Sequence, residues 1–162
     1  MIRFQKGATN TVTVTLTENS TLTNPIYLFQ FTNQQTATDY YFIATDTSTF
    51  KERYNQFQVV EKSNPDTLNG EVILGNEGFY NYYVYETTLA NTSGLSNASQ
   101  AVTYILNEVE NGLVWVVPEP MEKLEYDPEQ TAIAYQPAED DYLLTQSGDY
   151  LLLETGYLIE LE

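Results

Sequence analysis

The chain has 162 residues, which is enough for one domain with a buried core and an additional tail. Its formal net charge is −17, from 23 acidic and 6 basic residues, and it contains neither histidine nor cysteine. Because so acidic a surface repels phosphate, we expect no nucleic-acid binding and no association with an anionic membrane. The missing residue types exclude disulfides, histidine metal ligands and catalytic triads that need an imidazole.

Residues 10–31 carry the clearest strand patterns, after a short first strand expected at 1–5. From 11 to 17, threonines alternate with Val12, Val14 and Leu16, which predicts a strand with one wet face and one dry face. A polar connection and Pro25 lead to a second strand at 26–31, where both faces are largely apolar. This second pattern predicts a central strand covered on both sides, and therefore a second layer packed against its sheet.

The rest of the first two-thirds of the chain also alternates. We predict further strands at 40–44, 55–61, 71–74, 78–87, 102–106 and 113–117, with 40–44 pairing with 26–31. A capping-box pattern, Thr49 with Glu52, predicts one helical turn that bridges two sheets. Asn111-Gly112 predicts a tight turn between the last two strands. About nine short strands at these spacings predict an all-β fold, an antiparallel β-sandwich of jelly-roll or immunoglobulin-like type.

The last part of the chain differs in composition, since residues 119–162 hold 12 of the 23 acids and one of the six bases. We predict a sandwich domain over 1–118, an acidic, proline-containing extended arm over 119–140 and a short β-repeat segment over 141–162. In that segment DYLLTQSG is followed by DYLLLETG and YLIEL. Three such short strands cannot bury both of their faces alone.

We therefore expect 141–162 to dock on another copy of the chain or on another protein. Folding back onto its own sandwich and the absence of fixed structure are the alternatives. The predicted interface side chains are the tyrosines and leucines of the repeats: Tyr142, Leu143, Leu144, Tyr150, Leu151, Leu153, Tyr157 and Leu158.

Candidate chemistry is limited to carboxylates and aromatic rings. The acid pairs are Asp140 with Asp141, Glu108 with Glu110, and Glu125 with Asp127. A glycosidase needs two carboxylates facing each other across a cleft, whereas we expect these pairs in loops or the arm, surrounded by water. No loop has the spacing of a calcium-binding motif and no glycine-rich phosphate loop is present, so we predict no catalytic residue, no metal and no cofactor.

The tyrosine-rich stretches at 40–42 and 79–85 have two interpretations. Aromatic side chains in strands most often belong to a core or an interface. The alternative is a platform that stacks on sugars, for which changes at Tyr80 and Tyr82 are the test. No apolar run approaches the roughly 20 residues that span a bilayer. The first residues, MIRFQKG, lack the apolar stretch of a secretory signal, so we expect a soluble protein made in a cytoplasm.

Three segments resemble a family of small virion proteins from tailed phages of Bacteroidota, including crAss-like phages. They are TVTLTENSTLTNPIYLFQFTN, YYFIATDTSTFKERYNQF and GFYNYYVYE, and the resemblance extends over residues 10–117. Its most specific parts are the LTNP-YLF-FTN pattern and the KERYN-F pattern. The closing SGDYLLLETG is also similar to the ends of phage structural proteins.

The resemblance implies a part of the virion and no enzymatic activity. We expect a head–tail ring, collar or tail component, made in the host bacterial cytoplasm, that acts through subunit contacts as a homo-oligomer. Its partners would be other virion proteins such as portal, ring or tail subunits. The alternative is a head-fibre or host-glycan-binding adhesin component. An enzyme would have to work with carboxylates alone.

Overall fold

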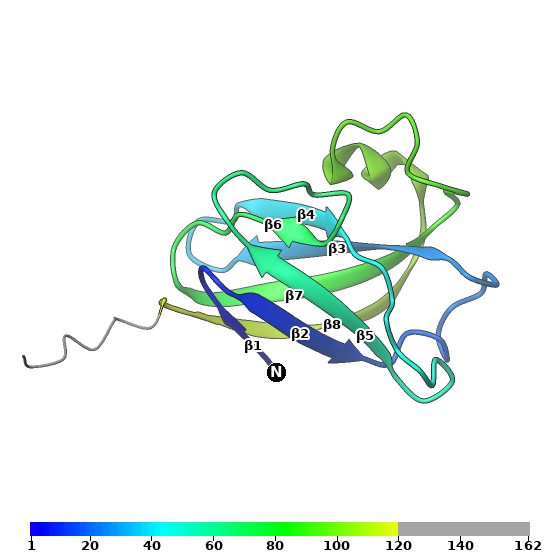
Figure 1. The fold of residues 1–162 in the computed structure, drawn as a ribbon, viewed down its shortest axis with the longest axis horizontal. Coiled ribbons are helices and arrows are strands. Elements are labelled where there is room, and N and C mark those ends of the chain that lie inside the picture. The colour runs from blue at the N-terminus through cyan, green and yellow to red at the C-terminus, as the bar shows by residue number, and fades with distance from the viewer. Residues whose placement is uncertain (120–162) are drawn as a thin grey trace, which may run out of the picture. The chain divides into compact units, whose positions relative to one another are not determined.

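The computed structural model describes residues 1–119, which form two β-sheets around a shared apolar core (Figure 1). The chain is therefore mostly β, as the sequence predicts. In sheet order, the larger sheet contains β1 (Ile2–Gln5), β8 (Ile105–Val117), β7 (Gly78–Thr87), β3 (Ile26–Asn33) and β4 (Asp39–Ile43). The smaller sheet contains β2 (Thr9–Val14), β5 (Asn55–Glu61) and β6 (Glu71–Val72). One 3-10 helix, η1 (Ala98–Tyr104), precedes β8.

Most neighbouring strands are antiparallel, but β1 lies parallel to β8 and β5 lies parallel to β6. The first and last described strands are thus adjacent, with Arg3 opposite Trp115. The hairpin predicted between 26–31 and 40–44 is confirmed, since Phe29 lies opposite Phe42.

The core is built from alternating inward side chains of both sheets. Phe29 of β3 stacks on Phe42 at a ring-centroid distance of 5.0 Å and meets Phe57 of the smaller sheet edge-on at 4.9 Å. The opposite face of β3 is also covered, because Leu28 is buried against Ala98 and Ala101 of η1. The prediction of a central strand with two apolar faces is confirmed.

Two predicted strands near the end of the domain are wrong in detail. Residues 102–106 are not a separate strand, because residues up to Tyr104 belong to η1 and β8 begins at Ile105. Asn111-Gly112 is not a turn but lies inside β8, with Gly112 opposite Tyr82. A Cβ atom on Gly112 would stand 2.7 Å from the ring of Tyr82, so close approach of this ring requires glycine. The domain therefore has eight strands rather than nine among its described residues.

The two strands of residues 10–31 do not pair with each other, because β2 belongs to the smaller sheet and β3 to the larger. The chain crosses between the sheets again after β4, where Asp46 bridges to Phe57. The predicted helical turn here is a single hydrogen-bonded turn in which the N–H of Tyr54 donates to the carbonyl of Phe50. The segment does connect the two sheets, as predicted.

Candidate binding surfaces

In the part of the chain that the structure describes, the outward side of the larger sheet carries a row of exposed, large apolar side chains. Phe79 of β7 and Trp115 of β8 are directly opposite each other, and their rings stack with centroids 6.4 Å apart at 24°. Phe79 is 49% exposed, and Leu113 and Trp115 are each 43% exposed. The larger sheet thus presents a contiguous apolar strip, which we call the aromatic row and define as Phe79, Leu113 and Trp115.

A second group on the same side combines rings with amides. Tyr83 and Tyr85 of β7 stack with centroids 6.3 Å apart. The hydroxyl of Tyr85 donates to the side-chain oxygen of Gln30 at 3.2 Å. Burial and the nearby Glu108 raise the pKa of Tyr85, so its hydroxyl remains a neutral donor at ordinary pH. The alternation predicted for 78–87 is confirmed, because Phe79, Asn81, Tyr83 and Tyr85 point outward.

Tyr80 and Tyr82 lie on the inward side of β7 and are buried. The hydroxyl of Tyr80 donates to the main-chain carbonyl of Asn76 at 2.5 Å, and that of Tyr82 to Glu110 at 2.7 Å. The interpretation that Tyr80 and Tyr82 could stack on a sugar is therefore wrong, because both rings are buried. The residues of β7 that can meet a ligand are their outward neighbours.

The second candidate surface is a groove of about 640 Å³ where β4 separates from β3. We call it the β3 groove. Residues 25–27 at the start of β3 form one wall, and residues 43–46, where the chain crosses to the smaller sheet, form the other. Leu22 of the β2–β3 loop and Leu68 before β6 add apolar surface. A volume of this size falls within the range typical of ligand pockets.

The main chain of Tyr27 faces the β4 side of β3. In an antiparallel sheet, alternate residues bond to one neighbouring strand and the residues between them bond to the other. The N–H of Gln34 donates to Phe79 at 3.0 Å and that of Asn33 to Thr38 at 3.0 Å, so even-numbered residues of β3 face β7 and odd-numbered ones face β4. Tyr27 therefore faces the β4 side.

The β3–β4 ladder ends at the groove. The last pair is Leu28 with Ile43, and the residue opposite Tyr27 would be Ala44. Ile43 instead bonds away from β3, to Thr67 and Gly70. Tyr27 and Ala44 thus lie at the edge of the ladder, and both line the groove. Both residues are largely buried and form part of the groove wall.

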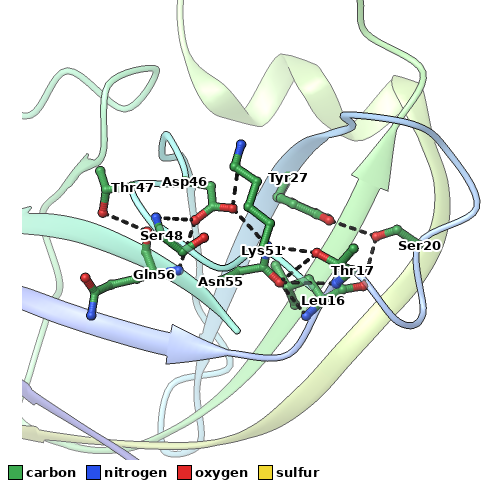
Figure 2. Close-up of polar contacts among 10 residues, drawn as sticks. All are labelled: Leu16, Thr17, Ser20, Tyr27, Asp46, Thr47, Ser48, Lys51, Asn55 and Gln56. Atoms are coloured by element: carbon green, nitrogen blue, oxygen red, sulfur yellow. Dashed lines mark hydrogen bonds and ion pairs between the residues drawn. The ribbon is translucent and has the colours of Figure 1, made fainter. Parts of the chain in front are cut away.

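A polar network fixes one end of the β3 groove (Figure 2). The buried Asn55 accepts hydrogen bonds from the main-chain N–H groups of Leu16 and Thr17, at 2.8 and 3.1 Å. Its amide nitrogen donates to Asp46 at 2.9 Å. Ser20 joins the network by donating to the Leu16 carbonyl and sharing a 2.8 Å hydrogen bond with the hydroxyl of Tyr27. These contacts hold the β2–β3 loop against both sheets.

Asp46 is the one acidic side chain of the groove lining and is largely buried. Burial alone would raise its pKa, but hydrogen bonds from Asn55, Ser48 and Gln56 outweigh burial and hold the pKa below its usual range. Its carboxylate is therefore charged at neutral pH. Lys51, with a side chain that is 57% exposed, stands 4.0 Å away and is the basic residue of the lining.

Glu86 secures the other side of the same loop. Its carboxylate is fully buried and accepts hydrogen bonds from the main-chain N–H groups of Thr21 and Leu22 and from the hydroxyl of Thr21. Burial raises the pKa of Glu86, but these hydrogen bonds outweigh burial and lower the pKa overall. All its donors come from the protein, so Glu86 anchors the loop and is not placed to react with a ligand.

The structure places only one of the predicted acid pairs. Glu108 and Glu110 lie within β8 rather than in a loop, and Glu110 accepts from Tyr82 and from the main-chain N–H of Thr15. Within residues 1–119, no three acidic side chains come together as a metal-binding group. The other two pairs, Glu125 with Asp127 and Asp140 with Asp141, lie outside the described residues.

All of the predicted interface side chains also lie outside the described residues: Tyr142, Leu143, Leu144, Tyr150, Leu151, Leu153, Tyr157 and Leu158. The same holds for the predicted arm from residue 120 onward.

Comparison with known proteins supplies no relative. No family model, no curated protein and no solved structure matches the chain. Among the described residues, no helix is long and apolar enough to cross a membrane.

Proposed function

We propose that the chain is a structural subunit of a tailed-phage virion, a ring, collar or tail component that acts through subunit–subunit contacts. The observation that supports this most is the aromatic row, because exposed, contiguous large apolar side chains mark a surface that another protein covers. The resemblance of residues 10–117 to small virion proteins suggests that the assembly is a phage particle. The proposed partners are further copies of the chain and other virion proteins, and the protein is made in the bacterial cytoplasm.

The aromatic row can be tested with one substitution and a closely matched control. Leu113→Asp is expected to weaken self-association or binding to the neighbouring virion protein at least tenfold, because it places a charge in a desolvated contact. Leu106→Asp is the control, since Leu106 lies on the same strand and is similarly exposed, at 48% against 43%. Light scattering of the purified chain and incorporation into particles measure the effect. Equal association of both variants would count against the proposal.

An adhesin or head-fibre role is the second candidate, favoured by the stacked rings of Tyr83 and Tyr85 beside the Gln30 amide. Ring faces and amides together suit neutral sugars, and the net charge of −17 disfavours acidic ones. If this role holds, the chain binds neutral glycans on an array and Tyr83→Ala abolishes binding. Tyr104→Ala is the control, because Tyr104 is an exposed tyrosine of η1 outside this group. An array without signal would remove this candidate.

We further propose that the sheets form an immunoglobulin-like sandwich, with residues 119–140 as an arm and 141–162 as docking β-repeats. The strand order β1-β8-β7-β3-β4 beside β2-β5-β6, with β1 parallel to β8, supports the sandwich assignment. The hydrogen bond from Tyr80 to a carbonyl four residues upstream supports it as well, because it has the form of a tyrosine corner.

A further inference from the structure

The β3 groove contains a buried carboxylate that can accept a further hydrogen bond. Asp46 belongs to the lining, and its side chain is only 9% exposed. Its Oδ1 atom accepts from the main-chain N–H groups of Ser48 and Gln56, at 2.9 and 3.1 Å. Its Oδ2 atom accepts from the side-chain amide of Asn55 at 2.9 Å. Because each carboxylate oxygen can accept two hydrogen bonds, Oδ2 has room for one more donor.

The ammonium group of Lys51 stands beside this oxygen without a hydrogen bond to it. The distance from Nζ of Lys51 to Oδ2 of Asp46 is 4.0 Å, which is an ion pair beyond hydrogen-bond range (Figure 2). The side chain of Lys51 is 57% exposed and its ammonium group is a donor. Asp46 and Lys51 therefore present an acceptor and a donor next to each other, and their charges offset.

Hydroxyl groups suit this pair, because a hydroxyl can donate to a carboxylate and accept from an ammonium group. Adjacent hydroxyls on a sugar ring can also divide the two bonds between them. Leu22, Ile43 and Leu68 add aliphatic surface on which the C–H groups of a sugar ring can pack. The rest of the lining carries no charge and includes short hydroxyl and amide side chains, among them Thr23, Asn24, Thr45, Asn69 and Asn91.

Charge and size disfavour other classes of ligand. The net charge of −17 repels an anionic ligand. A cationic ligand would have to displace Lys51, which already supplies the positive charge beside Asp46. The volume of about 640 Å³ is typical of a small-molecule site and leaves room for more than one sugar ring.

We propose that the β3 groove binds a short neutral saccharide, with Asp46 and Lys51 hydrogen-bonding to its hydroxyl groups. This binding goes beyond the proposed assembly function, which does not depend on the groove. The site is also distinct from the rings of Tyr83 and Tyr85, because neither belongs to its lining. Asn55 joins Asp46 to the main chain of Leu16, so the wall is held in place before binding, which lowers the entropy cost of binding.

Nuclear magnetic resonance of the isotope-labelled full-length chain tests the proposal with defined probes. The probes are neutral disaccharides: cellobiose, maltose, lactose and diacetylchitobiose. At least one of them is expected to shift the amide signals of Leu22, Ala44 and Leu68, with a Kd of about 0.1–10 mM. The amide of Tyr83, outside the groove, serves as the internal reference.

Two variants and one control connect the binding to the groove. Lys51→Ala is expected to weaken binding about fivefold or more, because it removes a donor from a side chain that the fold does not need. Lys62→Ala is the matched control, since Lys62 is also an exposed lysine in an ion pair but lies outside the lining. Thr45→Trp places a bulky ring at an exposed position of the lining and is expected to abolish binding.

The possible outcomes distinguish this site from the other proposals. The groove site would be overturned if no disaccharide shifted its amides, or if Lys51→Ala and Lys62→Ala bound equally well. Shifts confined to Tyr83 and Tyr85 would also overturn it and would favour the adhesin candidate. Choline is the cationic probe, and binding of choline in place of the disaccharides would show that the ligand class is wrong. Light scattering of Thr45→Trp should match that of the native chain, so a failure of assembly is measured separately.

Discussion

Glu86→Gln is expected to lower the free energy of unfolding at pH 7 by about 2–3 kcal/mol, because a buried acceptor of several hydrogen bonds is lost. Both oxygens of the native carboxylate accept from the N–H of Thr21; one also accepts from the hydroxyl of Thr21 and the other from the N–H of Leu22. Glutamine keeps one of these oxygens and turns an N–H₂ group toward donors. Urea denaturation measures the change.

The same variant also has a defined pH signature. The hydrogen bonds hold the pKa of Glu86 below its unfolded value, so its contribution to stability is present above the unfolded pKa and is lost as pH falls through the folded pKa. Glu86→Gln should therefore lose less stability on acidification than the native chain. Glu108→Gln is the control, because Glu108 is an exposed acid of β8 whose oxygen accepts from Asn111. Equal losses in the two variants would contradict this account.

Asn55→Ala is expected to cost about 2–4 kcal/mol, because it leaves the N–H groups of Leu16 and Thr17 without their acceptor in a buried position. It also removes the donor that faces Asp46. Gln58→Ala on the same strand is the control and should stay within about 0.5 kcal/mol, because its side chain is exposed and bonds to the hydroxyl of Thr11. Thermal and urea denaturation of both variants check the difference.

A small effect of Asn55→Ala would mean that the β2–β3 loop holds its place without the network of Figure 2. In that case the wall of the β3 groove would not be fixed before a ligand arrives. The two large effects predicted here therefore bear on function, because Glu86 and Asn55 hold the two sides of the same loop.

Strands were predicted best where one face is exposed to solvent and the other is buried. β5 and β7 agree with the predicted 55–61 and 78–87, because buried residues alternate with more accessible ones along most of each strand. The apolar character of both faces of β3 also had a structural cause, the packing of η1 over Leu28. The periodicity of apolar residues reflects which residues are buried, and it therefore predicted β3, β5 and β7 correctly.

The errors arose where a distant residue decides the local structure. Asn111-Gly112 has the composition of a turn, yet the ring of Tyr82 on the neighbouring strand occupies the space above Gly112. The sequence also contained no indication of the β3 groove, because residues far apart in the sequence form and hold its walls. Asn55 reaches Thr17, 38 positions away, and Glu86 reaches Thr21, 65 positions away.

The parallel pairing of β1 with β8 has a consequence for biosynthesis. Residues 2–5 gain their sheet neighbour only once residues 114–117 have emerged from the ribosome, so the larger sheet cannot close before β8 has been made. Until then the inward ring of Phe4 has no β8 strand beside it, although it ends fully buried. Closure joins the two ends of the domain, and contacts of such high sequence separation make folding slow. Closure of the larger sheet is therefore a late step in the folding of this domain.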